Sequence, residues 1–238
     1  MPATTAAADG NDALALLGDV PAFAGLPDGV LKRLAVNARE AMVPAGATVY
    51  EHGRRPDYLH VLLEGQVGLF GIGADGESTV VEVLHAVDQF TLAAVLTDAP
   101  YLMAARALTP ARLFLIEAAR LRNIVQSEPQ LAVVMITSLS RHYRMLVQQV
   151  KDLKLHSTAQ RLGCFLLGLA REQRDVRKLK LPYDKQLLAA RLGTTPENLS
   201  RAFATLRTHG VSTSGAMVSL DDVAGLTEFS QPDANPER

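Results

Sequence analysis

The chain of 238 residues has one cysteine, no tryptophan and no long apolar run. The single cysteine, Cys164, excludes an internal disulfide, and it excludes an iron–sulfur cluster or an all-cysteine zinc site within one chain. No apolar stretch approaches the roughly 18–20 residues that a membrane span needs. Residues 1–12 are rich in alanine and lack the basic start of a secretory signal. We therefore expect a cytoplasmic protein with no membrane partner.

Net charge is also nearly absent, at −1, but the charges are unevenly distributed. Residues 141–209 carry 14 Lys and Arg against 5 Asp and Glu. Residues 1–140 carry 9 against 15, and residues 210–238 carry 1 against 5. A basic run is often only a solvated face, but a local excess of this size also favours contact with phosphates. The charge pattern therefore indicates a nucleic-acid-binding segment within 141–209.

The basic segment contains a helix-turn-helix pattern at residues 185–206. Ala189 is the small residue that lets two steeply crossing helices touch, and Gly193 suits the left-handed turn between them. Thr195 followed by Pro196 is typical of a helix start, since Thr caps and Pro is favoured at the first position. The expected apolar seam of the two helices consists of Leu188, Leu192, Leu199 and Ala202.

Three polar residues follow near the N-terminus of the second helix, the end that enters the major groove in this motif. Arg201 can bond guanine through two donors, Glu197 can accept from cytosine, and Ser200 can do either. These residues also have ordinary explanations, because the helix dipole favours an acidic first turn and Arg201 lies four positions after Glu197. The agreement of turn, cap and local charge favours DNA binding.

The segment from about residue 40 to 118 consists of short β-rich runs separated by Gly and Asp. The pair Asp75-Gly76 is a strong hairpin signal. Several short strands at this spacing predict a β-sandwich or β-roll. A short helix is expected at Phe23–Ala35, and residues 1–14 are expected to be mobile.

A long helix is predicted from Pro129 onward, with apolar residues in alternating steps of four and three. This spacing is typical of a coiled-coil seam, and we expect the helix to hold a homodimer. A second apolar side, with Leu131, Val134, Met135 and Val147, is expected to pack on the β domain. Two-fold symmetry would place two DNA-reading helices about 34 Å apart, which matches a palindrome. The expected dimerisation residues are Ile136, Leu139, Tyr143, Leu146, Val150 and Leu153.

The predicted fold class is α+β. It combines an N-terminal cyclic-nucleotide-binding-like β-roll (jelly roll), a long dimerisation helix and a C-terminal winged helix-turn-helix. A helix at Gln160–Glu172 should open the last domain, and Val211–Leu220, with Gly215 in the middle, should form its β wing. The expected boundaries are a mobile segment at 1–19, the roll at 20–128, the dimerisation helix at 129–156, the DNA-binding domain at 157–229 and a tail at 230–238.

This order of parts resembles the CRP/FNR superfamily of bacterial transcription regulators. The most specific matches are Leu63–Val67 in the roll, the heptad helix and Glu197–Arg201, which is similar to the Glu-x-x-Ser-Arg reader of the FNR-type branch. The resemblance implies double-stranded DNA with TTGAT and ATCAA half-sites, phosphate contacts by Lys185 and Gln186, and RNA polymerase as a partner. The implied DNA-binding residues are Glu197, Ser200, Arg201, Lys185, Gln186, Thr195 and Asn198.

The effector region departs from the family's cyclic-nucleotide pattern. That pattern has a Gly-Glu pair and, some ten residues later, an Arg-Ser pair that hold ribose and phosphate. The matching stretches here are Phe90–Ala94 and Tyr101–Met103, with no carboxylate and no arginine. Burying a phosphate without a paired cation is costly, so cyclic AMP is not expected. The expected apolar effector pocket comprises Phe90, Leu92, Leu102, Met103, Leu146 and Val147.

The N-terminal cysteine cluster of the oxygen-sensing branch is absent, so no iron–sulfur cluster is expected. The runs Val150–Leu162 and Asp184–Leu187 are similar to the nitrogen-oxide-responsive branch, of the DNR and NnrR type. That resemblance implies activation of denitrification or nitric-oxide detoxification genes, with haem as the sensor. The candidate haem ligands are His85 and His142, although a surface histidine is commoner than a ligand.

Three other functions compete with this one. A cyclic-nucleotide-binding signalling module would need the missing carboxylate and arginine. An enzyme is not expected, because the sequence offers no nucleophile–base arrangement, no metal-ligand spacing and no phosphate-cradling glycine loop. A regulator of this family without any effector, or with another small ligand, stays open.

Overall fold

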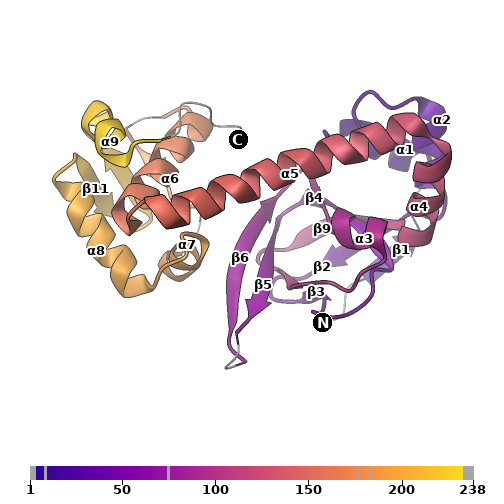
Figure 1. Ribbon diagram of the computed structural model, residues 1–238, viewed down its shortest axis with the longest axis horizontal. Helices are drawn as coiled ribbons and strands as arrows, with labels where there is room; N and C mark the ends of the chain where they lie inside the picture. The colour runs from indigo at the N-terminus through magenta and orange to yellow at the C-terminus, as the bar shows by residue number, and fades with distance from the viewer. Residues whose placement is uncertain (1–3, 8–9, 74–75, 176, 183, 233–238) are drawn as a thin grey trace. The chain divides into compact units, whose positions relative to one another are not determined.

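The computed structural model describes residues 4–7, 10–73, 76–175, 177–182 and 184–232. The chain divides into two compact units, Met1–His142 and Tyr143–Arg238, and the boundary falls inside the long helix α5 (Pro129–Leu155; Figure 1). The first unit is a β-roll with a layer of helices, and the second is a helical domain with a small sheet. This is the α+β class that the sequence predicted.

Two antiparallel sheets make up the roll. One has the order β1-β2-β9-β4-β7 and the other β3-β8-β5-β6. Leu62, Val67, Leu69, Phe90 and Leu113 are among the buried side chains between the sheets. The strands are β1 (Thr4–Ala7), β2 (Arg39–Val43), β3 (Thr48–Tyr50), β4 (Tyr58–Glu64), β5 (Gln66–Ile72), β6 (Ser78–His85), β7 (Asp88–Phe90), β8 (Ala104–Ala107) and β9 (Ala111–Glu117).

Gly65 explains the tight turn between β4 and β5. Its φ of +87° lies in the left-handed region, and a Cβ there would stand 2.3 Å from the carbonyl oxygen of Pro110. Only glycine meets both demands. The motif Leu63–Val67 is therefore set by the backbone of the roll, since the chain must reverse tightly against the loop before β9.

Helices form the second layer of this unit. The helices α1 (Gly10–Asp19), α2 (Asp28–Ala35) and α4 (Ala118–Ser127) gather beside the first turns of α5 (Figure 1). A short helix, α3 (Leu92–Thr97), follows β7. Buried members of their shared core include Leu17, Phe23, Leu34, Leu121, Leu131 and Met135.

The expectation that residues 1–19 form a mobile segment needs correction where the structure describes them. Strand β1 pairs with β2, and Ala13 and Leu17 of α1 are fully buried. Residues spaced by four lie on one face of a helix, so this face joins the core. The polar, alanine-rich composition gave no sign of this helix, whose leucines Leu14, Leu16 and Leu17 all contact the core.

Only part of the second apolar side of α5 packs as expected. Leu131 and Met135 are buried, and Val134 contacts the same core. Val147, which was expected to continue this side, is 48% exposed. The structure thus corrects the expectation for Val147.

The second unit opens with α6 (Thr158–Gln173), whose N-terminus carries a capping box between Ser157 and Gln160. Helix α6 packs against α8 and α9. The predicted wing is present as β11 and β12, and a third strand, β10, which was not predicted, pairs with β12. The remaining elements are β10 (Leu179–Lys180), α7 (Lys185–Arg191), α8 (Pro196–Arg207), β11 (Val211–Ser214), β12 (Met217–Leu220) and α9 (Val223–Ser230).

The expected polar tail at 230–238 also begins too early. Ser230 is the last residue of α9 and is fully buried. Its carbonyl oxygen accepts a hydrogen bond from Cys164 Sγ at 3.3 Å. Residues 233–238 of the expected tail lie outside the described residues.

Candidate functional site

Helices α7 and α8 form the predicted helix-turn-helix. Asp184 Oδ1 accepts from the backbone N–H of Leu187 at 2.8 Å and caps α7. Thr195 Oγ1 accepts from the backbone N–H of Asn198 at 3.3 Å and caps α8, with Pro196 at its first position. Each cap satisfies a backbone donor that a helix start leaves open. The predicted seam of Leu188, Ala189, Leu192, Leu199 and Ala202 is buried.

The turn between the two helices depends on Gly193. Its φ is +61°, and a Cβ there would lie 2.6 Å from Cδ2 of Leu153. Glycine relieves both constraints, so the end of α5 and the turn can approach each other. The sequence predicted the turn residue but not this neighbour.

The expected base readers lie together on the exposed face of α8. Glu197, Ser200 and Arg201 are all exposed. Hydrogen bonds from its own backbone N–H and from the Thr195 side chain lower the pKa of Glu197, and Arg201 lowers it further. The carboxylate is therefore ionised at neutral pH. Arg201 Nη1 donates to Asn198 Oδ1 at 3.5 Å, and Ser200 Oγ donates to the Pro196 carbonyl oxygen at 2.9 Å.

These contacts separate the seven expected DNA-binding residues by role. Thr195 caps the start of α8, and Asn198 accepts from the Arg201 side chain, so these two contact the expected readers' own helix turn. Lys185 and Gln186 are exposed in the first turn of α7. Further basic side chains are exposed near the wing strand β10, and they are Arg171, Arg174, Arg177, Lys178 and Lys180.

The expected dimerisation stripe is a row of exposed apolar side chains on α5. Ile136 is 63% exposed and Tyr143 67% exposed. Leu139 differs from the others, because it is half-buried against the helical core of the first unit. Exposed apolar stripes of this length are typical of interfaces. The other members of the stripe, Leu146, Val150 and Leu153, are also exposed in the single chain.

The expected effector pocket is not assembled by its six residues. Phe90 is buried between the sheets, whereas Leu92 is buried in the helical layer. Leu102 is 86% exposed, because Tyr101 before it takes the inward position. Met103 packs against the inter-sheet core, and Leu146 and Val147 are exposed on α5.

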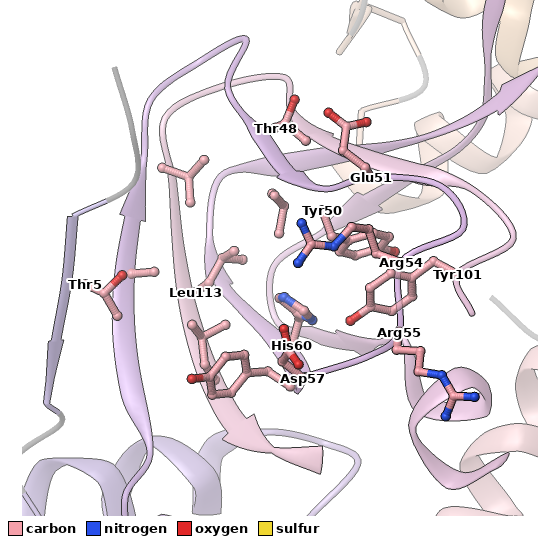
Figure 2. A pocket seen from close by; sticks show the side chains of 15 residues that line it. Thr5, Thr48, Tyr50, Glu51, Arg54, Arg55, Asp57, His60, Tyr101 and Leu113 are labelled. Atoms are coloured by element: carbon pink, nitrogen blue, oxygen red, sulfur yellow. The ribbon is translucent and has the colours of Figure 1, made fainter. Parts of the chain in front are cut away.

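A cavity of about 380 Å³ lies instead within the roll (Figure 2). None of the six expected pocket residues lines it. The lining comes from β1, β2, β3, β4, β9, the loop at 51–57 and Tyr101. Tyr50 and Tyr101 stack with ring centroids 3.9 Å apart, and the His60 ring lies 5.3 Å from that of Tyr50. The apolar lining consists of Ala41, Val43, Val49, Leu113 and Leu115.

His60 is the buried polar residue of this cavity, with 6% exposure. Its Nδ1 lies 3.3 Å from Thr91 Oγ1, and that hydroxyl donates to the Tyr58 carbonyl oxygen. Nδ1 therefore carries the proton, and Nε2 is an acceptor. Burial lowers the pKa of His60 to about 4, so the ring is neutral at pH 7. Thr91 holds a left-handed φ of 73°, which is unusual for a β-branched residue.

Haem does not fit the two histidines that were expected to bind it. A haem iron needs an axial ligand that reaches into an apolar pocket. His85 and His142 are exposed, and neither lines the roll cavity. Within the described residues, no cluster of three or more His, Cys, Asp or Glu is arranged to hold a metal ion. In the same part of the chain, no helix is long and apolar enough to cross a membrane.

Comparison with known proteins identifies both parts of the chain. Residues 40–128 match the cyclic nucleotide-binding domain, and residues 160–229 match the Crp-like helix-turn-helix domain. The CRP-like cAMP-activated global transcriptional regulator of Mycobacterium tuberculosis is 22% identical over 205 residues, which cover 84% of this chain and 92% of the relative.

Solved structures show the same arrangement of elements. A regulatory protein of Silicibacter pomeroyi DSS-3 is 29% identical with a TM-score of 0.61, over 93% of this chain and 99% of that chain. FixK2 of Bradyrhizobium japonicum has a TM-score of 0.70 at 20% identity, over 83% of this chain and 98% of that chain. The latter likeness concerns the fold.

Proposed function

Because the chain belongs to the CRP/FNR family of DNA-binding transcription regulators, we propose that it binds FNR-like palindromes as a homodimer and acts on RNA polymerase. The expected target has TTGAT and ATCAA half-sites separated by four base pairs. The observation that carries this proposal is the exposed trio Glu197, Ser200 and Arg201 at the capped start of α8.

Each reader offers the chemistry that a base edge requires. Arg201 presents the planar fork that bonds guanine O6 and N7, and its Nη1 donates to Asn198 Oδ1 one turn earlier in α8. The ionised Glu197 offers only acceptors, which suits the amino group of cytosine. The Ser200 hydroxyl donates a hydrogen bond to the Pro196 carbonyl oxygen, so its lone pairs remain free to accept from a base.

Phosphate contact would come from exposed basic side chains of the second unit. Lys185 lies in the first turn of α7, and the segment at 171–180 adds five more cations. Such contacts act on every sequence alike and release counterions, so they give affinity and salt dependence rather than specificity.

The exposed stripe on α5 supports a homodimer. Its apolar side chains recur in steps of four and three, which allows two copies of the helix to pack knobs into holes. A two-fold axis along this seam would present one α8 to each half-site.

Fluorescence anisotropy with a labelled palindrome and a scrambled duplex tests the proposal. Arg201→Ala should weaken palindrome binding by about 1–3 kcal/mol and relax specificity at one base pair. Lys185→Ala should weaken both duplexes similarly and reduce the salt slope by about 1. Arg207→Ala, at the far end of α8, is the matched control for loss of one cation. Equal losses on both duplexes for Arg201→Ala would contradict the reader assignment.

Control of denitrification or nitric-oxide detoxification genes by nitric oxide through haem stays a prediction of the resemblance. The exposure of His85 and His142 does not support it. Titration of the full chain with haem, followed by anisotropy with and without nitric oxide, decides between this sensor and a regulator without haem. A stoichiometric Soret band with nitric-oxide-dependent DNA binding would support the haem sensor. If neither signal is observed, haem is excluded, and the protein is an effector-free regulator or responds to another small ligand.

A further inference from the structure

We propose that the roll cavity binds a small, neutral, planar aromatic molecule that carries one O–H or N–H donor, in the class of phenols and indoles. The cavity has about 380 Å³ and lies within the range typical of ligand pockets. No residue of α5 and none of the six residues of the expected effector pocket lines it, so its lining differs from that expected from the sequence. The site belongs to the first unit alone, and its occupation does not require DNA.

The walls of the cavity select a flat apolar ring. Tyr50 and Tyr101 stack on each other, and His60 completes an aromatic cluster with them (Figure 2). Aromatic side chains prefer to contact other rings in stacked or edge-on geometry. The opposite lining is aliphatic, with Ala41, Val43, Leu113 and Leu115 among its members.

The polar requirement of the ligand follows from His60. Its Nδ1–H donates to the Thr91 hydroxyl, which in turn donates to the Tyr58 carbonyl oxygen, so Nε2 keeps its lone pair. Among the residues that the structure describes, no hydrogen bond reaches Nε2. A ligand that covers this acceptor must supply a donor, because a buried acceptor left without a partner is costly. A ligand O–H or N–H supplies that donor, whereas an acceptor-only ligand would be repelled.

The charges around the cavity favour a neutral ligand. The lining contains Arg54 and Arg55, but it also contains Glu51 and Asp57. Arg55 turns away from the cavity in Figure 2 and pairs with Asp98 at 3.1 Å. Burial raises the pKa of Tyr50 and of Tyr101, so both phenols stay neutral. Arg54 and Asp57 lie on either side of His60 in Figure 2, so the wall next to His60 carries one charge of each sign and no net charge for an ionised ligand to pair with.

Three naphthalene derivatives of similar size test the class of ligand. Isothermal titration calorimetry of the full chain at pH 7, without DNA, would compare 2-naphthol, 2-methoxynaphthalene and 2-naphthoate. We expect 2-naphthol to bind about ten-fold more tightly than 2-methoxynaphthalene, because only the former donates to Nε2. We expect 2-naphthoate to bind more weakly than 2-naphthol. Tighter binding of 2-naphthoate, equal binding of the first two probes or no binding at all would overturn the proposal.

Two kinds of variant locate the binding. His60→Phe keeps the aromatic ring but removes the acceptor, so the preference for 2-naphthol over 2-methoxynaphthalene should disappear. Ala41→Ile fills the cavity and should weaken 2-naphthol binding at least about ten-fold, whereas Met42→Ile places the same side chain on the opposite face of β2. Equal effects of the two isoleucines would overturn the location. If Ala41→Ile loses its cooperative thermal transition, the probe preference of His60→Phe decides the question.

Discussion

Acidification from pH 7 to pH 4 should destabilise the first unit through one residue, His60. Burial lowers the pKa of this histidine from its ordinary 6.5 to about 4. The unfolded chain therefore binds a proton between pH 6.5 and 4 that the folded chain refuses. Stability from the neutral ring is fully present above pH 6.5 and is lost as the pH falls through that window.

The size of the effect follows from the two pKa values. Each tenfold difference in proton affinity corresponds to about 1.4 kcal/mol, so the interval from 6.5 to about 4 gives a loss of about 3 kcal/mol. The groups that surround the ring do not offset it. Tyr50 and Tyr101 stay neutral, and the Thr91 hydroxyl does not titrate. A loss of this size is a large fraction of the stability of a small domain.

Urea unfolding of the wild type and of His60→Phe at pH 7, 6, 5 and 4 measures this loss. We expect the free energy of unfolding to fall about 3 kcal/mol further in the wild type than in the variant. Burial also raises the pKa of Asp88, but that carboxyl is present in both proteins and cancels in the comparison. An NMR titration of the His60 ring gives its pKa directly. Parallel losses in both proteins, or a ring that titrates near pH 6.5, would refute the reasoning.

Three further substitutions probe the rest of the molecule. Leu146→Asp should convert the dimer to monomer in light scattering at micromolar concentration, because it places an unpaired charge in the apolar seam; a stable dimer would place the interface elsewhere. Gly193→Ala should lower the free energy of unfolding by about 1–2 kcal/mol, because alanine resists a φ of +61°. Adding Leu153→Ala should recover only the part due to the 2.6 Å contact; complete recovery would exclude backbone strain. Ser157→Ala should cost about 1 kcal/mol in urea unfolding through loss of the α6 cap, and no change would show that the capping box is dispensable.

The helix-turn-helix could be predicted because its rules are local. Thr195 and Pro196 begin α8, Gly193 lies in the turn, and the buried apolar residues of the seam recur at helical spacing. All of these signals lie within 22 residues. The wing was predictable for the same reason, since Gly215 lies between two short strands. Its third strand, Leu179–Lys180, was missed because a strand of two residues carries no periodic pattern.

The cavity could not be predicted because its parts are distant in the sequence. Tyr50, His60, Thr91 and Tyr101 come together only when β3, β4 and the loops around α3 are in place. His60 stands in a strand whose neighbours Leu59 and Val61 are both fully buried, so alternation gave no signal for its side. Such a strand is covered on both faces, and its pattern does not separate a core residue from a cavity residue.

Tyr101 connects two features of the β-roll, the missing Arg-Ser pair and the aromatic cavity. It lies in the stretch where the cyclic-nucleotide pattern of the family has an Arg-Ser pair, yet its side chain is buried and stacks on Tyr50. In place of such a pair, this stretch contributes one wall of an aromatic cavity. An arginine at position 101 alone would not recreate the family's nucleotide pattern, because no carboxylate is present at Phe90–Ala94 and the stack on Tyr50 would be lost. The missing Arg-Ser pair and one aromatic wall of the cavity therefore belong to the same short stretch of the chain.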